Sequence, residues 1–272
     1  MKKRNWIFTV LAVLMAFTIV LPSCEDEPDA MELPPEESMV IDFSAFGTPQ
    51  DTVNTTKAVD STYTNWFHSF VNVSFWNVFT GVTLAVPVAA YGEAFNHEPV
   101  YMGDNTWEWQ YSYTFNASTF TARLVGSRLN NEAFSMTMYI TKTGMNAYEE
   151  FKWFEGTVRY DHTHASWTLY ESPDNPVALL SVEWNKDYET GESDITYEVV
   201  KESSEHVGDY IEFAVMPEDV YDAHYDIVLQ EGSVEIEWDR TTMAGRVRDE
   251  NKFGDANWHC WDENLMDSDC PQ

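Results

Sequence analysis

The most metal-like group of side chains in the sequence is Asp161-His162-Thr163-His164. Two histidines at positions i and i+2 of a strand lie on the same face, so His162 and His164 could both reach one ion. A zinc site needs a third and usually a fourth ligand, which the neighbouring sequence does not supply. The spacing therefore favours an exposed hairpin turn, with a metal site as the weaker alternative.

A second candidate metal site lies in the acidic C-terminal tail, which carries Asp255, Asp262, Glu263, Asp267 and Asp269. Carboxylate oxygens are the ligands that Ca²⁺ prefers, but the spacing is not that of an EF-hand loop. We therefore expect a solvated acidic tail. Calcium, held by Asp267 and Asp269, is the less favoured alternative.

Two tryptophans in the same tail, Trp258 and Trp261, are candidates for binding an apolar or glycan ligand through their ring faces. The competing interpretation is that they cover one end of a β-structure. Glu108, Glu183 and Glu237 each stand beside a Trp on an expected strand, but alternation places the Glu on the opposite face. This placement argues against a pocket shared by the two side chains.

No nucleophile elbow, phosphate-binding loop or dinucleotide fingerprint occurs in the sequence. A glycosidase needs two carboxylates about 5 to 9.5 Å apart in space, and a sequence with 46 acidic residues does not fix such a pair. The absence of a catalytic motif favours a protein that is not an enzyme. A carboxylate-dependent hydrolase is the weaker alternative.

The first 24 residues are arranged like a bacterial export signal. Three basic residues, at positions 2–4, precede an uncharged and largely apolar run over residues 6–21. Leu21-Pro22-Ser23-Cys24 resembles the lipobox, in which the cysteine thiol receives a diacylglyceryl group before cleavage. The resemblance implies a signal peptide over residues 1–23 and a bilayer anchor on acylated Cys24. The alternatives are an ordinary signal peptide and a transmembrane anchor, for which the run is short of about 20 residues.

Residues 24–38 are rich in Glu, Asp and Pro, a composition that favours a solvated tether. Acidic residues directly behind a lipidated cysteine resemble the surface-export signal of Bacteroidota lipoproteins. As a whole the chain resembles the uncharacterised outer-membrane and surface lipoproteins of that phylum. The resemblance implies an outer-membrane anchor and a surface-facing domain, with a periplasm-facing domain as the alternative, and it supplies no catalytic residues.

The charge and the cysteines agree with export. The formal net charge is −31, and removal of Lys2, Lys3 and Arg4 with the signal would take it to −34. Such a surface repels phosphate backbones, which excludes nucleic acid as a partner. If Cys24 is acylated, Cys260 and Cys270 remain, and we expect them to form a disulfide in an oxidising compartment.

Residues 60–95 are expected to form one long helix. Asp60-Ser61-Thr62 supplies capping side chains, and the apolar residues that follow cover most of the circumference at 100° per residue. We therefore expect a helix that is buried on several sides, and Pro87 should kink or end it. A transmembrane helix is less favoured because polar residues interrupt the run.

Beyond Pro99 apolar residues recur with a period of two, which predicts antiparallel strands separated by turns. Nine such segments span residues 107–115, 120–124, 134–140, 167–169, 180–184, 195–199, 211–215, 225–229 and 234–238. They predict a mainly β protein with one long helix: an up-and-down meander of about ten strands, curled into an open barrel around or against the helix. The outline resembles the open-barrel lipid carriers of the bacterial periplasm.

These patterns divide the chain into a signal peptide (1–23), a tether (24–38), an irregular lead-in (39–59), the helix (60–95), the meander (96–250) and a disulfide-closed tail (251–272). The function that they favour is a non-catalytic binding protein of the cell envelope, with an apolar or glycan ligand at the barrel mouth. The alternative is a structural subunit that binds an envelope protein partner.

Overall fold

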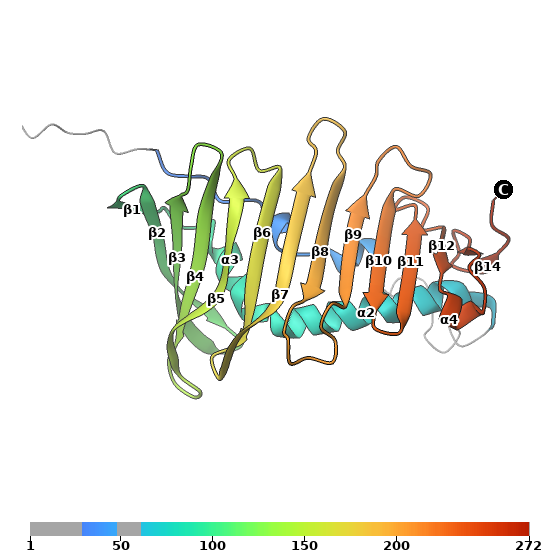
Figure 1. The fold of residues 1–272 in the computed structure, drawn as a ribbon, viewed down its shortest axis with the longest axis horizontal. Coiled ribbons are helices and arrows are strands. Elements are labelled where there is room, and N and C mark those ends of the chain that lie inside the picture. Colours follow the sequence, from blue (N-terminus) through green and yellow to red (C-terminus); the bar gives the residue numbers. More distant parts are fainter. Residues whose placement is uncertain (1–28, 48–60, 272) are drawn as a thin grey trace, which may run out of the picture.

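The computed structural model describes residues 29–47 and 61–271. Cys24 and the expected signal peptide lie outside the described residues. Within them, the chain forms a single sheet of fourteen antiparallel strands that pair in sequence order (Figure 1). The strands are β1 Val100–Gly103, β2 Thr106–Phe115, β3 Ser118–Arg128, β4 Ala133–Lys142, β5 Tyr148–Arg159, β6 His164–Ser172, β7 Asn175–Lys186, β8 Ser193–Val199, β9 Tyr210–Val215, β10 Ala223–Leu229, β11 Gly232–Trp238, β12 Gly245–Arg248, β13 His259–Trp261 and β14 Asp267–Ser268.

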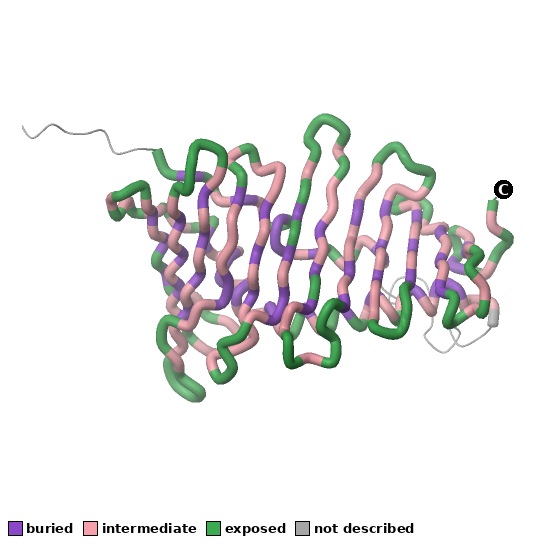
Figure 2. Tube along the Cα trace, viewed as in Figure 1, coloured by how far each residue is buried: buried purple, intermediate pink, exposed green. Residues whose placement is uncertain are grey.

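The predicted alternation is confirmed, because each of the nine segments lies within a strand. Along most strands buried residues alternate with more exposed ones, as in β4, where Phe134, Met136, Met138 and Ile140 are buried (Figure 2). One face of the sheet therefore carries the apolar core. The opposite face carries the charged side chains, including Glu108.

Strand β5 is not predicted by the alternation, since Trp153 and Phe154 are neighbours and both are buried. The pairing of β4 with β5 shifts at this point: Met138 pairs with Phe154, and Tyr139 pairs with Lys152. Trp153 is thus the extra residue of a β-bulge, which interrupts the period of two.

The prediction of a mainly β protein built on an antiparallel meander is confirmed, with fourteen strands in place of about ten. The sheet is not closed into a barrel, and in the described part of the chain β1 and β14 form its two edges. Both edge strands are short, which limits the hydrogen bonds that a closing ladder could make. The apolar face is covered instead by helices and by residues 29–47, which cross the sheet from its β2–β4 end (Figure 1).

Residues 31–47 are held against the sheet through their backbone carbonyls. The Trp167 indole nitrogen donates to the Ser38 carbonyl at 2.8 Å, and the Tyr197 hydroxyl donates to the Met39 carbonyl at 2.5 Å. Met31 and Ser38 are buried. The expectation of a solvated tether is therefore wrong from Met31 onward, because these residues satisfy hydrogen-bond donors that the aromatic core would otherwise bury unpaired. Two 3₁₀ helices, η1 Glu36–Ser38 and η2 Phe43–Phe46, shape the segment.

The predicted helix is present as two helices, α2 Thr64–Thr83 and α3 Ala85–Ala94, bent by 69° at Leu84. Pro87 lies in the first turn of α3, where its missing N–H is tolerated. A 3₁₀ turn, η3 Ser61–Tyr63, precedes α2, and a short helix, α4 Glu250–Phe253, follows β12. Among the described residues no single helix is long and apolar enough to span a membrane, although the bent pair together passes that test.

Helix α2 is less covered than expected. It lies across the apolar face of the sheet from β14 toward β7 (Figure 1), and Trp66, Val73 and Trp76 are buried beneath it. Its outer side is open, with exposed fractions of 58% for Phe75 and 78% for Val82. The prediction of a helix buried on most sides is wrong for α2, because an open sheet covers only one side of it.

Candidate binding cavity beside the long helix

A cavity of about 600 Å³ lies between the C-terminal half of α2 and the sheet. Strands β5 to β8 and the loop that joins β8 to β9 border the cavity. It lies near the strand ends at which β6 and β8 finish and β7 begins, which are the lower ends in Figure 1. The volume is within the range of cavities that hold drug-sized ligands.

The walls of the cavity are apolar and largely aromatic. Phe75 and Phe79 lie one turn apart on α2, so their rings stack, with centroids 6.5 Å apart. Trp76 packs edge-on against Phe79, at 5.8 Å. The remaining apolar walls come from α2 and from three strands: Val82, Trp153, Leu179 and Val199.

The rim of the cavity carries charged groups that are paired with one another. The Lys201 ammonium lies 2.8 Å from a carboxylate oxygen of Glu171. The imidazole Nδ1 of His206 lies 2.9 Å from Oδ2 of Asp209, a carboxylate that is 4% exposed. The Lys201–Glu171 pair links the β8–β9 loop to β6, and the His206–Asp209 contact lies within the loop.

The His206–Asp209 pair resembles the base and orienting acid of a hydrolase, and Ser204 stands two residues before the histidine. The Ser204 hydroxyl, however, accepts a hydrogen bond from the His206 backbone N–H at 3.0 Å, which closes a local turn. A nucleophile must instead share a hydrogen bond with the imidazole of the base. The arrangement therefore orders the loop, and the chemistry that the cavity supports best is binding.

Three buried polar atoms on cavity-lining residues lack a hydrogen-bond partner within the described ranges: the indole nitrogens of Trp76 and Trp153 and Oδ1 of Asp209. An unsatisfied buried polar atom costs free energy. A ligand or water molecule that carried a hydrogen-bonding group into the cavity would reduce this cost. Two of the three atoms are donors, and the Asp209 oxygen is an acceptor.

The two histidines that were the candidate zinc ligands have different surroundings in the structure. His162 occupies the turn before β6 with a φ of 52°, and it lines a smaller cavity of about 280 Å³ beside residues 29–32. The His164 ring instead contacts Asn185, at 2.9 Å, and Glu183, at 3.6 Å. Within the described part of the chain, no group of three or more His, Cys, Asp or Glu side chains could hold a metal ion.

The acidic tail has a structural role at the start of α2. Asp267 accepts hydrogen bonds from the backbone N–H groups of Asn65, at 2.9 Å, and Thr64, at 3.2 Å. It thus caps the helix from 202 residues away in sequence. Asp269 is exposed. The sulfur atoms of Cys260 and Cys270 lie 2.06 Å apart in a disulfide, the pairing expected from the sequence.

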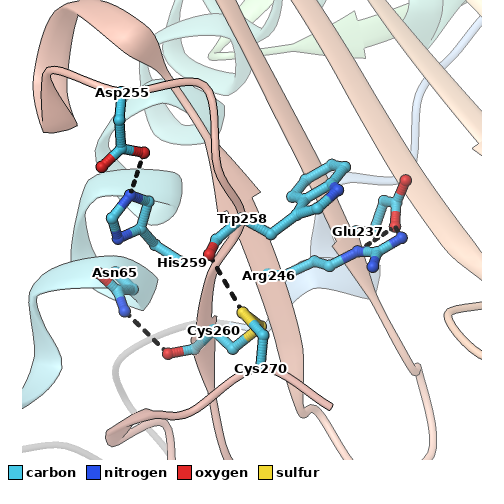
Figure 3. The surroundings of a disulfide bond; sticks show 8 residues. All are labelled: Asn65, Glu237, Arg246, Asp255, Trp258, His259, Cys260 and Cys270. Carbon is cyan, nitrogen blue, oxygen red and sulfur yellow. Dashed lines mark hydrogen bonds and ion pairs between the residues drawn. A yellow bond between two sulfur atoms is a disulfide. The ribbon is translucent and has the colours of Figure 1, made fainter. Parts of the chain in front are cut away.

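The tail tryptophans do not form an open binding platform. Trp261 is 2% exposed, and its indole nitrogen donates to the Met243 carbonyl at 2.8 Å. Trp258 lies against the guanidinium groups of Arg246 and Arg248, at 4.3 and 4.6 Å from the ring centroid, close to the disulfide (Figure 3). These residues stabilise the β12–β14 end of the sheet, and neither tryptophan lines the 600 Å³ cavity.

The cavity is assembled from residues that the sequence analysis did not combine. Its walls come from α2, from the bulged strand β5 and from a loop about 125 residues after the helix. The aromatic pair at positions 75 and 79 could have indicated the cavity, but this part of the helix was expected to be covered by the sheet. Comparison of the chain with protein-family models, curated proteins and solved structures finds no match.

Proposed function

We propose that the protein is a non-catalytic binding protein of the bacterial cell envelope that holds an apolar ligand beside α2. The observation that carries this proposal is the 600 Å³ cavity with aromatic walls and a paired polar rim. Pockets of this composition bind ligands through apolar contact, while a few polar groups fix the orientation.

An apolar ligand suits the cavity better than a glycan. A glycan presents many hydroxyl groups, each of which needs a partner when it leaves water. The charged side chains at the rim are already paired with one another, and the Thr83 hydroxyl is bonded to the Phe79 carbonyl at 2.7 Å. The walls therefore offer apolar surface and few free polar groups. A hydrocarbon chain with one polar end would contact the apolar walls and would need only a few polar groups of the protein.

The binding test uses a fluorescent fatty-acid analogue and two aspartate variants of α2. Val82 lines the cavity and is 78% exposed, while Val78 is 66% exposed and does not line it. Val82→Asp places a charge on an apolar wall and is expected to weaken binding at least tenfold, whereas Val78→Asp should bind as the wild type does. Equal effects of the two variants, or tighter binding of an uncharged oligosaccharide, would overturn the proposal.

The envelope location depends on the anchor at Cys24. Two or three acyl chains at this residue would hold the protein on the membrane essentially permanently, because each buried methylene contributes about 0.8 kcal/mol. Cys24→Ser is expected to release the protein into the soluble fraction of cells, measured by immunoblotting of separated membranes. Retention of the variant in the membrane fraction would refute the proposed anchor.

A second candidate function, an accessory subunit of an envelope complex, is favoured by the apolar side chains that α2 exposes. An exposed apolar patch on a soluble domain is typical of an interaction site.

A further inference from the structure

The open side of α2 carries an uninterrupted apolar stripe, formed by Val71, Phe75, Val78 and Val82. Their exposed fractions are 49%, 58%, 66% and 78%. The spacing of four, three and four residues places them on one face of the helix over about 16 Å. It is the spacing with which one helix packs against another along a heptad seam. Exposure of four large apolar side chains in this register is unfavourable unless a partner covers them.

The stripe lies on the least charged part of a strongly charged protein. The sequence from Thr64 to Gly92 contains no Asp, Glu, Lys or Arg, although the chain carries 46 acidic residues. Gly81, beside the stripe, has open space where a side chain would stand, so a backbone could approach closely there. Because this helix face has no charged side chains, an apolar partner can pack on it without burying a charge.

The surroundings of the stripe are acidic at both ends. Near its C-terminal end, the loop of residues 201–209 carries the exposed Glu202 and Glu205. Near its N-terminal end, the residues around α4 include Glu250 and Asp255 against one lysine, and the buried Asp249 contacts His68 of α2 at 2.8 Å. A partner that carries basic residues on either side of an apolar seam would complement this pattern.

We infer that the stripe on α2 is a docking surface for an amphipathic helix of another envelope protein, with an apolar seam flanked by lysine or arginine. A second copy of this chain is disfavoured, because two molecules of net charge −31 repel each other. An anionic lipid surface is disfavoured for the same reason. The inference rests on the accessory-subunit function proposed above. Phe75 and Val82 of the stripe also line the cavity, so the test uses Val78, which does not.

The test uses a synthetic helical peptide with a heptad leucine seam and flanking lysines, titrated against the full chain by fluorescence anisotropy. Val78→Asp is expected to weaken binding at least tenfold. Val220→Asp is the matched control: it makes the same charge change at a valine that is 83% exposed outside α2, and it should leave binding within twofold of the wild type. A peptide with glutamate flanks should bind at least tenfold more weakly than the lysine peptide.

Three results would overturn the inference. The first is equal binding of the peptide by the two aspartate variants, which would show that attraction to the acidic surface alone is measured. The second is a dimer of the wild type in sedimentation that Val78→Asp converts to a monomer, which would assign the stripe to a second copy. The third is binding of neutral phosphatidylcholine vesicles that Val78→Asp abolishes, which would assign it to a lipid surface.

Discussion

Asp249 joins two elements through its two carboxylate oxygens. Oδ1 accepts from the backbone N–H groups of Asn251 and Lys252 and so caps α4, while Oδ2 lies 2.8 Å from Nε2 of His68 on α2. Burial lowers the pKa of His68 below its usual value, and the hydrogen bond to Asp249 offsets this effect only in part. The neutral imidazole that donates to Asp249 is therefore the form that the fold favours.

This pKa shift predicts a loss of stability in mild acid. Below pH about 6.5 the unfolded chain binds a proton at this histidine that the folded chain resists, so the free energy of unfolding falls as the pH falls. His68→Gln removes the contribution. The decrease in Tm between pH 7.5 and pH 5.5, measured by circular dichroism, should be smaller for the variant than for the wild type. An equal decrease in both proteins would assign the pH dependence to other groups.

At the residue scale, sequence patterns predicted the disulfide but not the cap of α2. Cys260 and Cys270 follow from the count of cysteines in an exported chain. The role of Asp267 does not, because its two hydrogen-bond partners are some 200 residues away in the sequence. Trp258 and Trp261 were candidates for binding a ligand or for covering one end of a β-structure, and their contacts with Arg246 and with the core favour the second interpretation.

At the element scale, α2 depends on a cap that the last strand supplies. Asp267→Ala removes the hydrogen bonds to the first N–H groups of the helix and should lower the free energy of unfolding by about 1 kcal/mol. For a domain of this size that corresponds to a decrease in Tm of about 2 to 4 °C. Asp269→Ala, two residues further along and exposed, is the control, and its Tm should match the wild type. Equal Tm values for Asp267→Ala and the wild type would show that the cap does not stabilise the fold.

The disulfide holds this capping strand in place. It links Cys260 of β13 to Cys270, just beyond β14. The two cysteines are separated by 10 positions in the sequence. Closing such a loop should stabilise the fold by about 3 kcal/mol. The paired variant Cys260→Ser with Cys270→Ser is therefore expected to unfold at lower urea concentration than the wild type. An unchanged midpoint would show that strand pairing alone positions β14.

Element types were predictable where one physical signal dominated. Alternation gave nine strands because each has one face against the core. Strand β5 was missed at its bulge, and β1, β12, β13 and β14 are too short to show a period. Pro87 was expected to kink or end the long helix. The helix does break, but at Leu84, three residues before the proline.

At the scale of the whole molecule, the open sheet produces both of the proposed binding surfaces. Alternation fixes which face of a strand is apolar, but it does not fix whether fourteen strands close on themselves. Because this sheet stays open, one side of α2 is left uncovered and a cavity remains beside its C-terminal half. Because the sheet is not closed into a barrel, we place the expected ligand in the apolar cavity beside α2 rather than at a barrel mouth.

We propose that an apolar ligand occupies the cavity in contact with Trp76. Quenching of tryptophan fluorescence by a brominated fatty acid measures this contact, because bromine quenches only indoles that lie close to it. We expect saturable quenching in the wild type, absent with the unbrominated acid, and a clear reduction of its amplitude in Trp76→Phe with unchanged affinity. Quenching of the same amplitude in Trp76→Phe and the wild type, or no saturable quenching at all, would show that no apolar ligand binds beside Trp76.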